Sequence, residues 1–219
     1  MKKPAFILLF FFFFASPALC AGSFYTPAMS LDELKQGNLR FLGEKPLHPR
    51  QGREERRQSL PGGQHPKALI ISCVDARVPV EVIFDQGIGD VSVLRVPGNT
   101  AGRDVQIGIR QAIGKLQVPL VVVLGHTDCE SVNDVCAGES AELLPDIARV
   151  ARKVKKEEPE LAGREHAFRQ RVVLRNVQNS IDEILDKQPG IAELIASNSL
   201  TVVGAVYDLE SGRVTWMDY

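Results

Sequence analysis

Residues 68–77 read ALIISCVDAR, and residues 119–129 read PLVVVLGHTDC. In both stretches a short run rich in Ile, Leu and Val ends abruptly in polar, reactive side chains. Such runs are typical of strands buried inside a parallel sheet. In open α/β sheets the functional site lies just beyond the carboxyl ends of the strands. We therefore expect the two polar segments to meet at one edge of a parallel sheet.

The two segments bring two thiols and an imidazole to that edge, from Cys73, His126 and Cys129. Thiolate and imidazole are ligands that zinc prefers. Three protein ligands leave a fourth coordination position for water or substrate, as in catalytic zinc sites. The sequence therefore predicts a Zn²⁺ cofactor with a catalytic role.

The same residues carry a resemblance to a known family. The chain resembles the β-class carbonic anhydrases, whose pattern is Cys-x-Asp-x-Arg at one strand end and His-x-x-Cys at another. The likeness continues through residues 83–90, 95–99 and 203–209. Either half of the pattern is weak alone, whereas both halves together, each after a strand, are specific. The resemblance implies zinc-dependent, reversible hydration of carbon dioxide to bicarbonate and a proton through zinc-bound hydroxide.

Asp75 and Arg77 complete the first half of the pattern. An aspartate this close to zinc can take the fourth coordination site itself, and the arginine two residues on can hold it away through a bidentate pair. The resemblance implies both arrangements, with Asp75 as a metal ligand in the closed state only. It assigns both residues a catalytic role.

Gln64, nine residues before Cys73, matches a family glutamine that reaches the substrate from across a dimer interface. The resemblance therefore implies that Gln64 binds substrate and that the protein is a homodimer or a homotetramer built from dimers.

Two alternatives remain open at the level of sequence. The same zinc chemistry serves hydrolases of carbonyl sulfide or carbon disulfide, and a related chain can keep the zinc and lose turnover. Ser92 stands where many family members have a phenylalanine that lines the substrate cleft, and Glu130 stands where glycine is usual. Ile70 replaces the tryptophan of bicarbonate-regulated members, so we do not expect that regulatory pocket.

Composition points to a small molecule as the partner, and the resemblance implies that this substrate is carbon dioxide or bicarbonate. The net charge of −1, with 24% charged residues, gives no electrostatic reason to expect nucleic acid or an anionic membrane as a partner.

Two lysines followed by a phenylalanine-rich apolar run and small residues have the layout of a secretory signal peptide over residues 1–22. We therefore expect an exported, periplasmic protein without stable membrane insertion after cleavage. Cys136 is expected to be a small buried side chain.

The predicted fold class is α/β, with a mainly parallel four-stranded sheet flanked by helices and a fifth strand at one edge. The predicted organisation is a signal peptide (1–22), an N-terminal helical arm and loop (23–63) and an α/β zinc catalytic domain (64–219). Ser30 is the predicted N-cap of the arm helix, with Glu33 three residues on. The remaining expected elements are a loop over 43–63, helices over 78–84, 103–116, 141–158 and 164–187, and strands over 91–96, 200–207 and 214–217.

Overall fold

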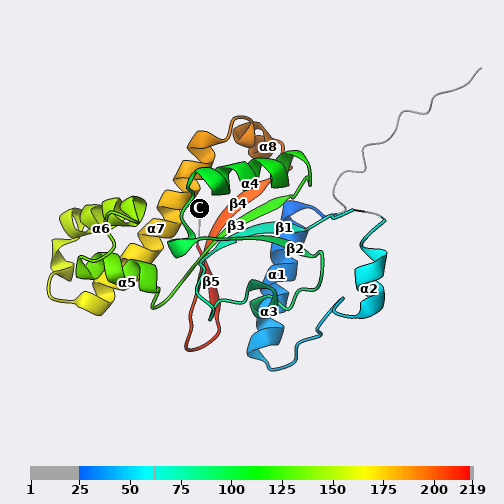
Figure 1. Ribbon diagram of the computed structural model, residues 1–219, viewed down its shortest axis with the longest axis horizontal. Helices are drawn as coiled ribbons and strands as arrows, with labels where there is room; N and C mark the ends of the chain where they lie inside the picture. Colours follow the sequence, from blue (N-terminus) through cyan, green and yellow to red (C-terminus); the bar gives the residue numbers. More distant parts are fainter. Residues whose placement is uncertain (1–24, 62, 218–219) are drawn as a thin grey trace, which may run out of the picture.

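The computed structural model describes residues 25–61 and 63–217, and the predicted signal peptide lies outside these residues. Its core is a five-stranded sheet with the order β2-β1-β3-β4-β5 (Figure 1). Strands β1 to β4 are parallel to their neighbours, and β5 pairs antiparallel with β4. The predicted fold class is therefore confirmed. The strands are β1 (Ala68–Ser72), β2 (Val91–Arg95), β3 (Leu120–His126), β4 (Thr201–Tyr207) and β5 (Val214–Trp216).

Helices cover both faces of the sheet, as their apolar stripes require. On one face, α4 (Arg103–Gly114), α7 (Glu165–Lys187) and α8 (Ile191–Ala196) enclose a core that includes Ile109 and Ile181. On the other face, α1 (Pro27–Leu42) and α3 (Val80–Ile83) enclose a core that includes Leu34. Because β1 and β3 lie between other strands and are covered on both faces, every residue of both is buried.

A third apolar cluster lies beyond the carboxyl edge of the sheet. It is formed by α5 (Glu130–Ala137), α6 (Pro145–Glu157), the short 3-10 helix η2 (Pro159–Leu161) and the first half of α7. These helices make the lobe at the left of Figure 1. Cys73 and Cys129 belong to this cluster, which therefore forms one wall around the predicted metal ligands.

The predicted start of the first helix is wrong. Helix α1 begins at Pro27 and is capped by Thr26, whose hydroxyl accepts a hydrogen bond from the Met29 N–H at 3.2 Å. Proline suits the first helical turn because its fixed φ matches the helix and its missing N–H would have no partner there. Ser30 lies inside the helix and is fully buried.

The predicted N-terminal arm has two parts of different character. Helix α1 packs on the core of its own chain, where the amide of Asn38 bonds to the carbonyls of Ile83 and Gly212. The predicted loop over 43–63 contains a short helix, α2 (Arg53–Gln58), which has no buried residue. Only this second part projects from the core (Figure 1).

Most other predicted elements are confirmed within a few residues, and two helices besides α2 were missed. Helix α4 ends at Gly114, two residues early, and α6 begins at Pro145 instead of residue 141. Helices α5 and α8 were not predicted. None of the helices in the described part of the chain combines the length and apolar character needed to span a bilayer.

Candidate metal centre

The predicted metal ligands come together at the carboxyl edge of the sheet. Cys73 directly follows β1, His126 is the last residue of β3, and Cys129 is the N-cap of α5. Because β1 and β3 are neighbours, their ends place the three side chains side by side. One ligand atom from each lies within 4.8 Å of the other two, and the residues are 2%, 0% and 2% exposed.

The distances between these atoms fit tetrahedral zinc. The two sulfurs are 3.9 Å apart. Two thiolates bound tetrahedrally at the usual Zn–S length are about 3.8 Å apart. A disulfide would require about 2.05 Å. The pair is therefore spaced for a shared metal ion and not for a disulfide.

The imidazole of His126 is oriented for ligation through one nitrogen. Its Nδ1 lies 2.9 Å from the carbonyl oxygen of Thr127, which can only accept, so Nδ1 carries the proton. Its Nε2 is buried and has no hydrogen-bond partner among the described residues. A buried nitrogen lone pair without a donor is costly unless a ligand satisfies it. The residues present therefore fit a zinc ion.

Electrostatics favour a thiolate at this position. The hydrogen bond from the Cys129 thiol, assisted by His126 and by the N–H groups of Asp75 and Gly98, lowers the pKa of Cys73 to about 4 against the opposing effect of burial. The same bond, together with burial, raises the pKa of Cys129. Of the two sulfurs, that of Cys73 is therefore the more readily ionised.

Asp75 and Arg77 form a close ion pair beside the ligands. Arg77 donates from Nε to Oδ1 at 3.0 Å and from Nη2 to Oδ2 at 2.6 Å, and its backbone N–H donates to Oδ1 at 2.9 Å. These bonds lower the pKa of Asp75 to about 2 against a smaller opposing effect of burial. Oδ2 of Asp75 is 3.9 Å from Nε2 of His126. The carboxylate is therefore ionised, next to the ligand set, and held by the arginine.

Arg95 is a site residue that the sequence did not reveal. Its Nε donates to the Cys73 carbonyl at 3.0 Å and its Nη2 to the Asp75 carbonyl at 2.5 Å. One guanidinium thus fixes the loop on both sides of Val74. The sequence signal was its place in residues 95–99, a stretch that shares the family likeness but was given no role; in the structure it ends β2 and pairs with Ser72.

Gln64 does not join the ligands of its own chain. It is exposed and lies before β1, at the amino edge of the sheet, in a pocket of about 360 Å³ shared with His65 and Ile88. The metal ligands lie at the opposite, carboxyl edge. Gln64 therefore lies apart from the metal ligands of its own chain.

The other singled-out residues are peripheral to the ligands. Cys136 is half-buried instead of fully buried, and burial raises its pKa to about 11. Ser92 is half-buried on β2, and Glu130 is exposed. None of the three belongs to the ligand cluster.

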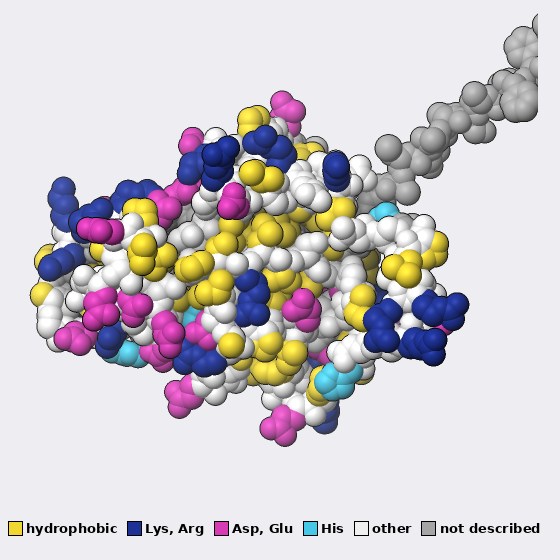
Figure 2. Space-filling model, viewed as in Figure 1, with side chains coloured by type: hydrophobic (Ala, Val, Ile, Leu, Met, Phe, Trp, Pro, Cys, Tyr) yellow, Lys and Arg dark blue, Asp and Glu magenta, His cyan; other side chains and the backbone are white. Residues whose placement is uncertain are grey.

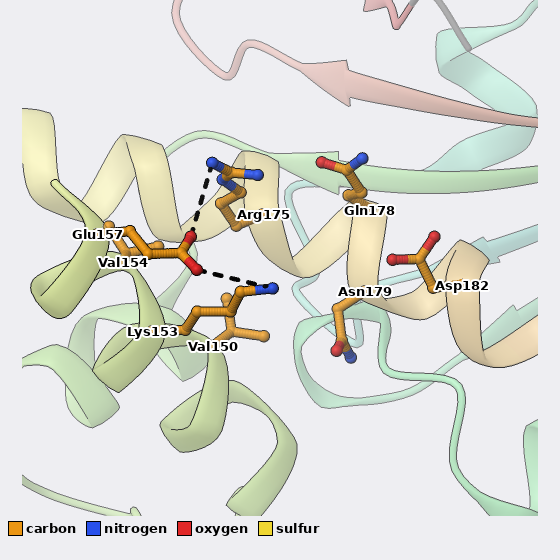
Figure 3. A pocket seen from close by; sticks show the side chains of 8 residues that line it. All are labelled: Val150, Lys153, Val154, Glu157, Arg175, Gln178, Asn179 and Asp182. Atoms are coloured by element: carbon orange, nitrogen blue, oxygen red, sulfur yellow. Dashed lines mark ion pairs between the residues drawn. The ribbon is translucent and has the colours of Figure 1, made fainter.

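A groove lies between α6 and α7, away from the metal ligands (Figure 3). It has a volume of about 130 Å³. Glu157 faces Lys153 at 4.0 Å and Arg175 at 3.9 Å across it. These opposite charges compensate one another, and the groove contains no ligand of the metal centre. It is therefore not the reactive site.

Comparison with known proteins identifies the family. The family model described as carbonic anhydrase matches residues 68–214. Carbonic anhydrase 2 of Mycobacterium tuberculosis is 37% identical over 199 residues, covering 88% of this chain and 94% of that protein. The carbonic anhydrase of Mycolicibacterium smegmatis is 35% identical over 196 residues, covering 86% of this chain and 92% of that protein.

Solved structures agree with this relationship. A tetrameric β-carbonic anhydrase of Sordaria macrospora superposes with a TM-score of 0.64 at 27% identity, covering 87% of this chain and 98% of that one. The β-carbonic anhydrase CafA of Aspergillus fumigatus superposes with a TM-score of 0.65 at 26% identity, covering 87% of this chain and 90% of that one. The chain belongs to the β-carbonic anhydrase family of enzymes.

Proposed function

We propose that this protein catalyses the reversible hydration of carbon dioxide to bicarbonate and a proton at a Zn²⁺ ion held by Cys73, His126 and Cys129. The observation that carries the proposal is the cluster itself, with two sulfurs 3.9 Å apart and a buried, unpartnered imidazole nitrogen beside them. When bound, zinc supplies a Lewis acid that lowers the pKa of water to about 7, which makes a hydroxide nucleophile available near neutral pH.

The protein's own residues orient that nucleophile. Asp75, kept ionised by Arg77, is only an acceptor, so it takes a hydrogen bond from the nucleophile and directs a lone pair toward the carbon of the substrate. Arg77 holds both carboxylate oxygens, which keeps Asp75 off the metal position. Arg95 holds the loop that carries Cys73 and Asp75. A zinc ion held by the three ligands would thus keep a coordination position for water and substrate.

A homodimer, or a tetramer of dimers, is part of this proposal, with Gln64 of one chain contacting substrate in the site of its partner. The position of Gln64 at the opposite edge of its own sheet supports it. Figure 2 shows hydrophobic side chains gathered over the middle of the face that β2 borders. The edge strand β2 is only half-buried over Val91–Leu94. Sedimentation velocity tests the assembly, and a monomer that retains full activity would refute the role of Gln64.

We also propose export to the periplasm with removal of residues 1–22. The positive start, the apolar run and the small residues that follow support it. Mass spectrometry of the mature protein from cell fractions would locate the new N-terminus.

Stopped-flow carbon dioxide hydration, with zinc content measured on the same sample, tests the activity. Cys73→Ser should lose zinc and activity together, and Asp75→Ala should keep zinc and lose activity. Cys136→Ser, the matched control outside the ligand cluster, should keep both. About one zinc per chain without carbon dioxide hydration would refute the proposal. Turnover of carbonyl sulfide or carbon disulfide by that sample would then identify the sulfur-substrate hydrolase, and no turnover would identify a silent zinc protein.

A further inference from the structure

The residue after the ligand His126 contacts the imidazole of that ligand. The carbonyl oxygen of Thr127 lies 2.9 Å from Nδ1 of His126, which leaves Nε2 as the nitrogen for a metal. A metal-bound histidine usually donates from its other ring nitrogen to such an acceptor, and this bond fixes the orientation of the ring. The direction of the Thr127 carbonyl therefore decides where the ligand nitrogen points.

Two hydrogen bonds fix Thr127 to the C-terminal part of the sheet. Its N–H donates to the Tyr207 carbonyl at 2.9 Å, at the end of β4. Its hydroxyl oxygen accepts a hydrogen bond from the Leu209 N–H at 3.0 Å, in the turn between β4 and β5. Leu209 is 82 positions further along the chain, so only the tertiary structure brings this donor to the metal centre.

The Thr127 carbonyl keeps little freedom once the N–H and the side chain of the same residue are held. It can turn only together with the N–H of Asp128, because the peptide group between them is planar. Asp128 has a left-handed backbone conformation, with φ of 49°, and its carbonyl accepts a hydrogen bond from Nη2 of Arg77 at 3.2 Å. The chain is therefore fixed on both sides of the peptide group that contacts His126.

We infer that Thr127 is a positioning residue of the metal centre, whose hydroxyl, held by the Leu209 N–H, keeps the Thr127 carbonyl on Nδ1 of His126. The inference rests on the proposed zinc centre. Thr127 is half-buried and lines a pocket of about 390 Å³, so its side chain is not needed to fill the core. The turn over residues 208–213 thus acquires a role in metal binding, although none of these residues belongs to the ligand cluster.

The test measures zinc affinity by competition with a chromogenic chelator, and the visible absorption spectrum of the cobalt(II)-substituted protein. Thr127→Val keeps the size of the side chain and removes the hydroxyl. It should weaken zinc binding about tenfold, at the lower end of the range for outer-sphere substitutions, because the hydroxyl acts through the carbonyl. The ligand-field bands of cobalt should shift, because they depend on the direction of the ligand nitrogen. Thr127→Ser keeps the hydroxyl and should preserve both wild-type readouts.

Thr26→Val is the matched control. The hydroxyl of Thr26 also accepts a hydrogen bond from a backbone N–H, that of Met29 at 3.2 Å, but it lies at the start of α1 and outside the ligand cluster. This variant should lose stability and keep the zinc affinity and the cobalt spectrum of the wild type. If Thr127→Val does not fold, Thr127→Ala replaces it, because that change removes the same hydroxyl and adds no atom.

The outcomes separate this inference from the proposed function. Unchanged zinc affinity and unchanged cobalt bands in folded Thr127→Val would overturn the inference and leave the zinc centre intact. Losses in Thr127→Ser as large as those in Thr127→Val would also overturn it, because the hydroxyl would then not be the group that matters. An equal loss of zinc affinity in Thr26→Val would overturn it as a general effect of stability. A wild-type protein that binds no zinc would instead refute the metal centre, and the inference with it.

Discussion

Asn38 is the buried side chain on which the docking of α1 most depends. Its Nδ2 donates to the carbonyls of Ile83 at 3.2 Å and Gly212 at 3.0 Å, and its Oδ1 accepts from the Val214 N–H at 3.0 Å. It therefore joins the N-terminal helix to α3 and to the C-terminal hairpin. Asn38 is only 4% exposed, so Asn38→Ala would leave two carbonyls and one N–H without hydrogen-bond partners in the interior.

The size of the effect follows from these three groups. A buried group that loses its partner costs about 1–3 kcal/mol. Three such groups sum to about 3–9 kcal/mol, and because single substitutions rarely cost more than about 5 kcal/mol, we expect Asn38→Ala to lower the free energy of unfolding by about 3–5 kcal/mol. With a urea m-value of about 2 kcal/mol/M, the unfolding midpoint should fall by about 1.5–2.5 M.

Urea unfolding followed by far-ultraviolet circular dichroism, at fixed protein and zinc concentrations, measures this effect. Gln36→Ala is the control, because Gln36 lies on the exposed side of the same helix. It should change the free energy of unfolding by less than about 0.5 kcal/mol. A loss below about 1 kcal/mol for Asn38→Ala, or equal losses in both variants, would show that α1 does not depend on these hydrogen bonds for its place on the core.

Three further outcomes are expected. Arg95→Leu should lower kcat about tenfold while circular dichroism stays unchanged, because only the metal-binding loop loses its support. Burial opposes ionisation of Asp85, but hydrogen bonds from the Leu47 N–H, Arg40 and the His48 N–H outweigh it and lower its pKa. Its stabilising contribution is therefore present above its unfolded pKa of about 3.9 and is lost as the pH falls through the folded pKa. Asp85→Asn should thus flatten the acid side of the stability profile, and a profile identical to wild type would contradict this. Cys136, whose pKa is raised to about 11, should react with iodoacetamide at pH 8 more slowly than a free thiol, as mass spectrometry of the labelled protein would show.

The sheet and the ligand set were predictable because they depend on local sequence. The apolar runs before Cys73 and His126 are typical of buried strands in a parallel sheet. The carboxyl ends of such strands lie at the same edge of the sheet, so the residues that follow them lie close together. The missed helix α5 shows the limit of this reasoning. It begins without a capping side chain at Cys129, and its short polar residues compete with the helix for backbone hydrogen bonds. Helix α5 is stabilised instead by the packing of Val132 and Val135 in the third apolar cluster.

Tertiary contacts account for the other features that the sequence did not predict. Ser30 with Glu33 has the local pattern of a capping box, yet Pro27 starts the helix earlier and Ser30 is buried by packing. The role of Arg95 depends on its register with Ser72, which no local pattern encodes. The resemblance implied that Gln64 acts across a dimer interface, and its position at the amino edge of the sheet, away from the ligands of its own chain, agrees with that expectation.

The interior position of the ligand-bearing strands links metal retention to folding. Strand β1 lies between β2 and β3, and β3 lies between β1 and β4. Interior strands exchange their amide hydrogens only when the whole domain opens. Cys73 and His126 therefore cannot separate while the sheet persists, and each tenfold rise in free zinc above its dissociation constant would add about 1.4 kcal/mol to the free energy of unfolding. Zinc release during denaturation would then follow the loss of the sheet itself.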